Sequence, residues 1–379
     1  MGLDLQEKER RYRLIRENMA DKRLDALIVI SDAQINHKGF VKYLTNYRSI
    51  LYNLVVILPL KGDARLLVPS PVQKYWAELL SWIGTIEEQI PNLTETLKRN
   101  LAEMGLFAAT IGLVNDRIMP AGTYNALTHS FPELSLVDAT SMIEELRMRK
   151  ADAELEAVKA AAALADLSFR ILSENLKEGM TERELIGLID GKLIAEGAED
   201  IFHLFSSRPG NLFPYAPSDR AVQKGDVIIL NTEVSGPGGY WVQMIRTVFY
   251  GKPKRQVEEM YDILIRIRSA LTSELRPNRK ASEVAAWVRK EIMGAGFEVG
   301  VNFGHCLGLD VVERPLIHLN EEAMLQPGMV LTVHPQLVST DKDATVWLGD
   351  TYLITETGSE LLTKVEPAEV ERIEWGALC

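Results

Sequence analysis

The stretch DVIILNTEVSGPGGYWVQMIRT, residues 226–247, contains two apolar runs on either side of the turn-forming segment Ser-Gly-Pro-Gly-Gly. This pattern predicts two consecutive strands joined by a turn. Polar side chains stand in the middle of both runs, with Asn231 and Glu233 in the first and Gln243 in the second. A buried polar group destabilises a strand unless it has a partner. We therefore treat these residues as candidates for a functional site.

The pattern of the whole chain predicts two domains. Up to about residue 140, short apolar runs alternate with helical segments, which is typical of an α/β unit with helices packed on a mixed or mostly parallel sheet. Residues 142–197 are almost wholly helical in pattern, with a capping signal at Thr181 and Glu184, so we place a boundary near 142–152. The ranges predicted as strands are 26–31, 54–58, 65–68, 110–114, 134–137, 226–234, 240–250, 329–337 and 345–355. The ranges predicted as helices are 5–24, 93–104, 121–129, 256–275 and 281–295.

The composition narrows the class of protein. Of 379 residues, 46% are hydrophobic and 25% are charged, and the formal net charge is −11. This acidic balance argues against nucleic-acid binding, because phosphate neutralisation requires a concentrated positive surface. No apolar run approaches the ~20 residues that span a bilayer. The first 24 residues lack the apolar core of a secretory signal. Two cysteines cannot form a disulfide framework. We expect a cytoplasmic protein that binds neither nucleic acid nor a membrane.

Five spaced motifs in the second half of the chain indicate a family. They are Pro-Ser-Asp-Arg with Gln-x-Gly-Asp at 217–226, Gly-Tyr and Arg-Thr-Val at 239–248, Gly-His-x-x-Gly-Leu at 304–309, Glu-x-Pro at 313–315 and Pro-Gly-Met-Val at 327–330. In this order they resemble the creatinase, prolidase and methionine aminopeptidase family. The resemblance implies an α/β (α+β) protein, with a mixed-sheet, creatinase-type N-terminal domain over 1–145 and a pita-bread catalytic domain over 150–379.

The resemblance also implies where metal ligands would stand. The metallopeptidases of this family hold two divalent ions with two Asp, one His and two Glu, and the corresponding positions here are Asn231, Gln243, His305, His334 and Gly349. Only the histidine is kept, and all four carboxylates are absent. Neutral amides do not offset the charge of two divalent cations, so we predict no metal and no other cofactor. The alternative is a single Fe or Zn ion held by His305, His334 and one carboxylate.

The remaining groups suggest acid/base chemistry. His305 and His334 are expected to lie close together, so that one imidazole activates water and the other protonates a leaving nitrogen. Glu313 and Glu233, the latter at a position where the family usually has glycine, are expected to orient them or to bind a cationic substrate group. The residues predicted to bind substrate are Tyr215, Asn231, Gln243, Arg246 and His203. Each of these roles has a structural alternative. His334 would be a hydrogen-bonded histidine of the core, Glu233 would face solvent, and Arg246 would pair with a nearby acidic residue.

The Leu-Asn-Thr context of Asn231 resembles creatinase, the branch of the family that hydrolyses a C–N bond without metal. We accordingly predict a metal-independent, creatinase-like hydrolase, not a peptidase, that cleaves a C–N bond in a small amidine, amide or cyclic amino-acid-like substrate. Three alternatives stay open: a metal-dependent Xaa-Pro dipeptidase or aminopeptidase, a lyase acting by proton abstraction, and a non-catalytic peptide-binding relative. The resemblance further implies a homodimer in which the N-terminal domain of one chain helps to close the active site of the other. We take a residue near 43–47 as the candidate for that role.

Overall fold

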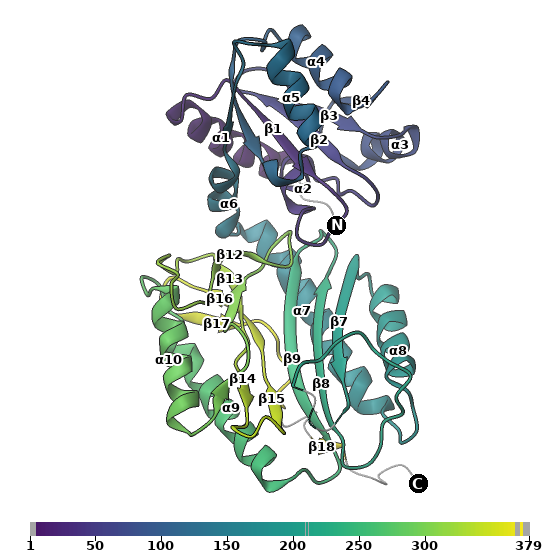
Figure 1. Ribbon diagram of the computed structural model, residues 1–379, viewed down its shortest axis with the longest axis vertical. Helices are drawn as coiled ribbons and strands as arrows, with labels where there is room; N and C mark the ends of the chain where they lie inside the picture. Colours follow the sequence, from purple (N-terminus) through teal and green to yellow (C-terminus); the bar gives the residue numbers. More distant parts are fainter. Residues whose placement is uncertain (1–4, 209, 211, 368–371, 374–379) are drawn as a thin grey trace. The chain divides into compact units, whose positions relative to one another are not determined.

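The computed structural model describes residues 5–208, 210, 212–367 and 372–373, and the chain folds into two compact units, Met1–Arg147 and Met148–Cys379 (Figure 1). Both units combine sheets with helices. The predicted α/β (α+β) class is thereby confirmed.

The N-terminal unit is built on one six-stranded sheet of order β4-β3-β2-β1-β5-β6. Strand β2 pairs antiparallel with both β1 and β3. Strand β4 runs parallel to β3, and β5 and β6 run parallel to β1, so the sheet is mixed as predicted. Apolar residues of β1, β2 and β5 pack against α4 and α5 to form its core. Its strands are β1 (Ala26–Ser31), β2 (Leu54–Pro59), β3 (Arg65–Val68), β4 (Thr85–Glu88), β5 (Thr110–Val114) and β6 (Ser135–Asp138). Its helices are α1 (Leu5–Asp21), α2 (Gly39–Thr45), α3 (Pro71–Leu80), α4 (Leu93–Glu103), the 3-10 turn η1 (Asp116–Ile118), α5 (Ala121–Ser130) and α6 (Thr140–Met148).

In its described residues, the C-terminal unit contains three sheets and two pairs of helices. Helices α7 and α8 pack against the sheet β18-β9-β8-β7, and α9 and α10 pack against the strands of the other two sheets, β10-β14-β15 and β12-β11-β13-β16-β17 (Figure 1). The helices are α7 (Asp152–Asn175), α8 (Glu182–Ala195), α9 (Arg255–Glu274) and α10 (Ala281–Gly294). The strands are β7 (Asp200–Ser206), β8 (Val227–Ser235), β9 (Trp241–Tyr250), β10 (Glu298–Val299), β11 (Gly304–Cys306), β12 (Glu313–Leu316), β13 (Val330–Val333), β14 (Gln336–Val338), β15 (Thr345–Trp347), β16 (Asp350–Ile354), β17 (Ser359–Leu361) and β18 (Arg372–Ile373).

The hairpin β8–β9 forms where the sequence predicts it. Its turn uses Gly238 and Gly239 at φ values of 100° and 77°, a backbone conformation that residues with a Cβ rarely adopt. The two strands pair in an unbroken antiparallel register that sets Glu233 opposite Gln243 and Asn231 opposite Ile245. Residues two apart on a strand share a face, so all four side chains lie on the same face of the sheet.

Two stretches predicted as single strands are each divided in the structure. The run 329–337 becomes β13 and β14, and the run 345–355 becomes β15 and β16. The chain changes sheets at both places, because β13 pairs with β16 while β14 pairs with β15. His334 and Gly349 stand at these two corners, and Gly349 also bridges to Ile245 of β9. The corners therefore connect the hairpin β8–β9 to the strands that carry the predicted histidines.

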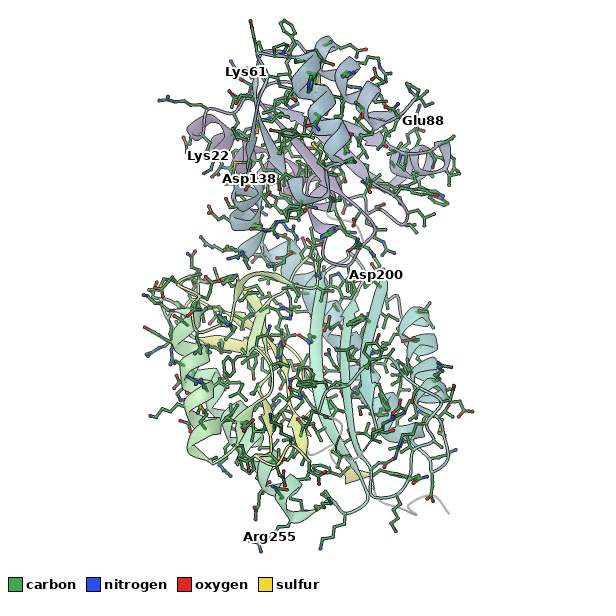
Figure 2. All side chains as sticks on the ribbon, viewed as in Figure 1. Lys22, Lys61, Glu88, Asp138, Asp200 and Arg255 are labelled. Atoms are coloured by element: carbon green, nitrogen blue, oxygen red, sulfur yellow. The ribbon has the colours of Figure 1, made fainter. Side chains whose placement is uncertain are left out.

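Charged side chains project from the surface of both units. Figure 2 shows charged side chains such as Lys22 and Lys61 of the N-terminal unit and Arg255 of the C-terminal unit projecting outward. Across the described ranges no helix is long and apolar enough to cross a membrane. Of the N-terminal residues that we expected near a partner's site, Tyr43 and Tyr47 are buried, and the Arg11 guanidinium lies over the Tyr43 ring at 4.2 Å.

Candidate functional site

The polar residues of the hairpin form one hydrogen-bonded group, which we call the amide–carboxylate cluster: Asn231, Glu233 and Gln243. Asn231 Nδ2 donates to Glu233 Oε1 over 2.9 Å, and Gln243 Nε2 donates to Asn231 Oδ1 and to Glu233 Oε1, each over 3.0 Å. All three side chains are buried. The register of β8 and β9 produces this contact, because it places residues 231, 233 and 243 on one face.

Glu233 is the only carboxylate of the cluster, and it is 7% exposed. Burial disfavours its ionised form and raises its pKa to about 7, against a smaller opposing effect of the hydrogen bond from Asn231. No ion pair to Glu233 is found among the residues that the structure describes. A second acceptor of the cluster also lacks a hydrogen-bond donor, since Gln243 Oε1 is buried without a partner.

His305 and His334 lie next to each other, as predicted. Antiparallel pairing of β11 with β13 sets His305 opposite Thr332, two residues before His334, and the ring centroids lie 5.6 Å apart in an edge-to-face arrangement. His305 Nδ1 lies 3.0 Å from the Cys306 carbonyl oxygen, which only a protonated Nδ1 can satisfy. His334 Nδ1 is buried without a partner, and its ring packs on Trp347 at 5.7 Å.

Burial disfavours the charged form of both imidazoles. Burial lowers the pKa of His305, against the smaller effect of the hydrogen bond to the Cys306 carbonyl. Burial also lowers the pKa of His334 to about 3, with repulsion from His305 as the second cause. Two adjacent imidazolium ions without a counter-charge would be strongly destabilised in such a site. The pair therefore offers hydrogen bonds rather than positive charge.

Glu313 occupies a structural position. Its Oε2 accepts from Lys150 Nζ over 3.0 Å, with both side chains almost completely buried. A Cβ on Gly308 would come within 2.4 Å of the Glu313 carboxylate, so only glycine leaves room for it. The ion pair ties the start of β12 to the segment that precedes α7. The prediction that Glu313 orients a catalytic histidine finds no support in these contacts.

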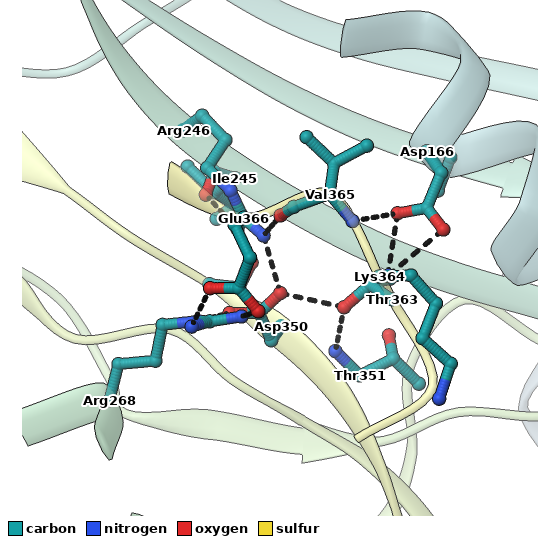
Figure 3. A network of polar contacts seen from close by, with 12 residues as sticks. Asp166, Ile245, Arg246, Arg268, Asp350, Thr351, Thr363, Lys364, Val365 and Glu366 are labelled. Atoms are coloured by element: carbon teal, nitrogen blue, oxygen red, sulfur yellow. Dashed lines mark hydrogen bonds and ion pairs between the residues drawn. The ribbon is translucent and has the colours of Figure 1, made fainter. Parts of the chain in front are cut away.

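Arg246 is likewise committed to the interior of the C-terminal unit (Figure 3). Its guanidinium is fully buried and donates to Asp350 Oδ1 over 2.7 Å and to the carbonyl oxygens of Ile245, Gly349 and Val365. Asp350 also pairs with Arg268 over 2.7 Å. This network fastens β9 to β16 and to the chain beyond β17. The predicted contact between Arg246 and a substrate carboxylate is therefore corrected to a structural role.

The structure separates His203 and Tyr215 from the cluster. His203 stands opposite Thr232, whose side chain points away from the face of Asn231 and Glu233, and it contacts Thr232 Oγ1 at 3.2 Å and Asp190 Oδ1 at 2.9 Å. It is a satisfied histidine on the other face of the sheet. Tyr215 is 77% exposed and lines a surface pocket of about 510 Å³ with Phe205 and Phe213.

Three residues at the site were not identified from the sequence. Lys150 neutralises Glu313, and nothing in the pattern of the helical stretch marks it as a partner. Trp347 donates its Nε1 hydrogen to the His334 carbonyl oxygen over 2.7 Å and covers the His334 ring. Thr332 pairs with His305 across β11 and β13 and precedes His334 by two residues. Its hydroxyl group is buried and has no hydrogen-bond partner. A Thr and a Trp within apolar strands were the available signals.

The residues present do not fit a pair of divalent metals. Within the described part of the chain, no three His, Cys, Asp or Glu side chains are grouped so as to hold a metal ion. Asn231 and Gln243 are neutral and already bonded to each other and to Glu233. At Gly349 an added Cβ would stand 2.7 Å from His334 Cβ and 3.1 Å from Ile245 Cγ1, so a glutamate has no room there. The single-ion alternative on His305, His334 and a carboxylate likewise lacks its third ligand.

Comparison with known proteins identifies the family. The model of metallopeptidase family M24 matches residues 156–356, and that of the creatinase/prolidase N-terminal domain matches 11–149. The chain belongs to metallopeptidase family M24. The Xaa-Pro dipeptidase of Pyrococcus horikoshii is 26% identical to this M24 chain over 315 residues, which cover 81% of the chain and 88% of the relative. A probable dipeptidase PepE of Mycobacterium tuberculosis is 29% identical over 266 residues, covering 65% and 70%.

Solved structures agree on the M24 fold. The prolidase from Pyrococcus horikoshii superposes with a TM-score of 0.82 at 24% identity, covering 94% of this chain and 99% of the prolidase. The Xaa-Pro dipeptidase from Bacillus anthracis superposes with a TM-score of 0.81 at 21% identity, covering 95% and 98%. The predicted family resemblance and the predicted arrangement of a creatinase-type domain before a pita-bread domain are confirmed.

The comparisons overturn the predicted activity. A metal-independent, creatinase-like hydrolase that is not a peptidase is contradicted by the family, which is one of metallopeptidases, and by relatives that carry the names of dipeptidases. Asn231 alone does not assign the chain to the creatinase branch. The absence of a ligand side chain shows which interaction a site lacks. The similarity of the whole chain is what assigns the protein to a group of relatives.

Proposed function

We propose that the C-terminal unit binds dipeptides of the Xaa-Pro type, the class that the names of its relatives indicate. The observation that carries the proposal is the set of hydrogen-bonding groups at the positions where the family resemblance puts metal ligands: Asn231, Gln243, His305 and His334. All four are buried and uncharged, and a dipeptide presents the carbonyl and amide groups that such side chains recognise. This proposal concerns recognition of the ligand.

Hydrolysis of the same ligands is the second candidate. The printed names of the relatives favour it, since both the curated and the solved proteins are called dipeptidases. The donor set argues against it, because the side chains that would hold two divalent ions are missing. Binding without hydrolysis is therefore the primary proposal.

One experiment separates the two candidates. Purified protein is titrated calorimetrically with Ala-Pro and Leu-Pro, and with Ala-Gly as a dipeptide that lacks proline. Each mixture is then assayed for free proline, with added Mn²⁺ or Co²⁺ and with EDTA. We expect saturable binding of the Xaa-Pro dipeptides under all conditions, with no proline released. Release of proline only with added metal would favour the dipeptidase, and absence of binding by any dipeptide would overturn both.

We also propose a cytoplasmic homodimer. The support for a dimer is an apolar face on the N-terminal unit, formed by the exposed side chains of helix α3. These side chains are Val72, Tyr75, Trp76, Leu79 and Leu80. Exposed apolar groups that follow one helical face are characteristic of interaction surfaces rather than of isolated surface residues.

A further inference from the structure

We propose that Glu233 and Gln243 bind the cationic α-amino group of the ligand directly. The inference rests on the proposed function and names the part of a dipeptide that the amide–carboxylate cluster recognises. It gives the cluster a ligand with one positive charge, where the metallopeptidases of the family use divalent ions.

The hydrogen-bonding pattern leaves acceptors open. Gln243 uses its amide hydrogens on Asn231 Oδ1 and Glu233 Oε1, and Asn231 Nδ2 also donates to Glu233 Oε1. Among the described residues, nothing donates to Gln243 Oε1, which is buried, and the hydrogen bonds to Glu233 all reach Oε1 and leave Oε2 open. Two acceptors on adjacent side chains require a group with several hydrogens to donate. An ammonium group carries three.

The charge of the cluster points to the same class of ligand. Glu233 is its only ionisable group, and the two amides are neutral. A buried carboxylate without a cationic partner is stabilised by a single positive charge, whereas a divalent ion would leave an uncompensated charge. A metal ion would in addition need more ligands than the cluster offers.

A direct test compares two ligands that differ only in the ammonium group. Ala-Pro and N-propionyl-proline have the same shape, but the second lacks the amino group. Both are titrated calorimetrically at pH 8 in EDTA into the wild-type protein, into Glu233→Gln and into the control Glu298→Gln, which changes an exposed glutamate of the same unit. We expect the wild type and the control to bind Ala-Pro about 30-fold or more tightly than N-propionyl-proline, the scale of a lost buried charge pair. In Glu233→Gln the preference is expected to fall to about threefold or less.

A second variant guards against an effect of folding. Gln243→Leu removes the other acceptor and leaves the carboxylate, and we expect it to lower the preference for Ala-Pro by about tenfold, with a circular dichroism spectrum like that of the wild type. Metal content by mass spectrometry accompanies each titration.

The outcomes that contradict the inference are distinct from those that contradict the proposed function. Equal affinity of the wild type for the two ligands, or an unchanged preference in Glu233→Gln, would overturn the role of Glu233 while dipeptide binding stands. Binding that requires retained metal, and is lost in EDTA, would overturn the direct contact with the ammonium group. Failure of the wild type to bind either ligand would overturn the proposed function itself.

Discussion

The buried carboxylate of Glu233 lowers the stability of the folded protein, and it provides a negative charge that a cationic ligand can pair with. Its carboxylate is held by two amide groups, yet burial makes its ionised form costly in the absence of a cation. The hydrogen bonds from Asn231 and Gln243 orient the group without neutralising it. Such an arrangement is expected where a charged ligand supplies the missing partner, and it predicts that the residue lowers the stability of the free protein.

We expect Glu233→Gln to stabilise the protein at pH 8 and to have little effect at pH 4. In the unfolded chain the carboxyl loses its proton near its ordinary value of 4.5, whereas in the folded protein its pKa is about 7. The free energy of unfolding of the wild type therefore falls as the pH rises from about 4.5 to about 7 and is constant beyond it, a loss of roughly 3 kcal/mol. Glutamine removes the ionisation and hence the loss.

Urea unfolding of the wild type and of Glu233→Gln at pH 4, 6 and 8 measures this difference. Other carboxyl groups affect both proteins equally, so only the difference between them counts. Glu298→Gln serves as the control, because its side chain is exposed. A variant less stable than the wild type at pH 8 would contradict the raised pKa of Glu233.

At the scale of elements, two strand corners define the site. The chain passes from β13 to β14 at His334 and from β15 to β16 at Gly349, and the second corner bridges to Ile245 of β9. Arg246 and Asp350 secure the same junction from inside (Figure 3). Close approach of the two corners explains why a glycine stands where the family resemblance places a metal-binding glutamate.

Gly349→Ala is expected to destabilise the protein by about 1–3 kcal/mol, the usual effect of overpacking a close-packed interior. The added Cβ would stand 2.7 Å from His334 Cβ and 3.1 Å from Ile245 Cγ1, at a junction where Gly349 also bridges to Ile245. Thermal or urea unfolding measures the change. The matched control is Gly358→Ala, at a position where an added Cβ meets no atom within 4 Å. Equal stability of the two variants would show that the corners are not closely packed.

At the scale of the molecule, helix α3 exposes an apolar face to solvent. The positions exposed on it recur at intervals of three and four residues, from Val72 through Tyr75, Trp76, Leu79 and Leu80, which is the spacing of an apolar face that packs against something. Gln73 and Ala77 occupy the buried side. A second copy of the chain is the partner that the dimer proposal assigns to this face.

We expect Leu79→Lys to convert the dimer to a monomer. Leu79 is 60% exposed, so a lysine there costs the single chain little, but it would place a charge in the apolar interface. Light scattering coupled to gel filtration should give about twice 42.5 kDa for the wild type and about 42.5 kDa for the variant. The control is Ile194→Lys, at a position that is 64% exposed on α8, outside the proposed face. A monomeric wild type, or a dimeric Leu79→Lys, would rule out this interface.

The pattern of residues along the chain determined the class of fold and much of the strand and helix content. Apolar runs bounded by turn residues predicted β1, β2, β3, β5, β8 and β9, because a strand buried on both faces leaves a continuous apolar signal. The capping signal at Thr181 is also confirmed, since Thr181 and Glu184 bond each other reciprocally. Helix α3 and strand β4 were missed, because the first exposes its apolar side and the second is a short, partly exposed edge strand.

What the side chains do was decided only by the tertiary structure. The sequence by itself picked out the polar positions in the hairpin and the two histidines, since polar residues within apolar strands are locally visible. It could not show that Glu313 pairs with Lys150, that Arg246 pairs with Asp350, or that His203 lies on the opposite face from Asn231. Those facts depend on strand register and on contacts between residues as many as 163 positions apart. A hydrogen bond or an ion pair forms only where folding brings its two groups together, and the order of residues along the chain does not contain that distance.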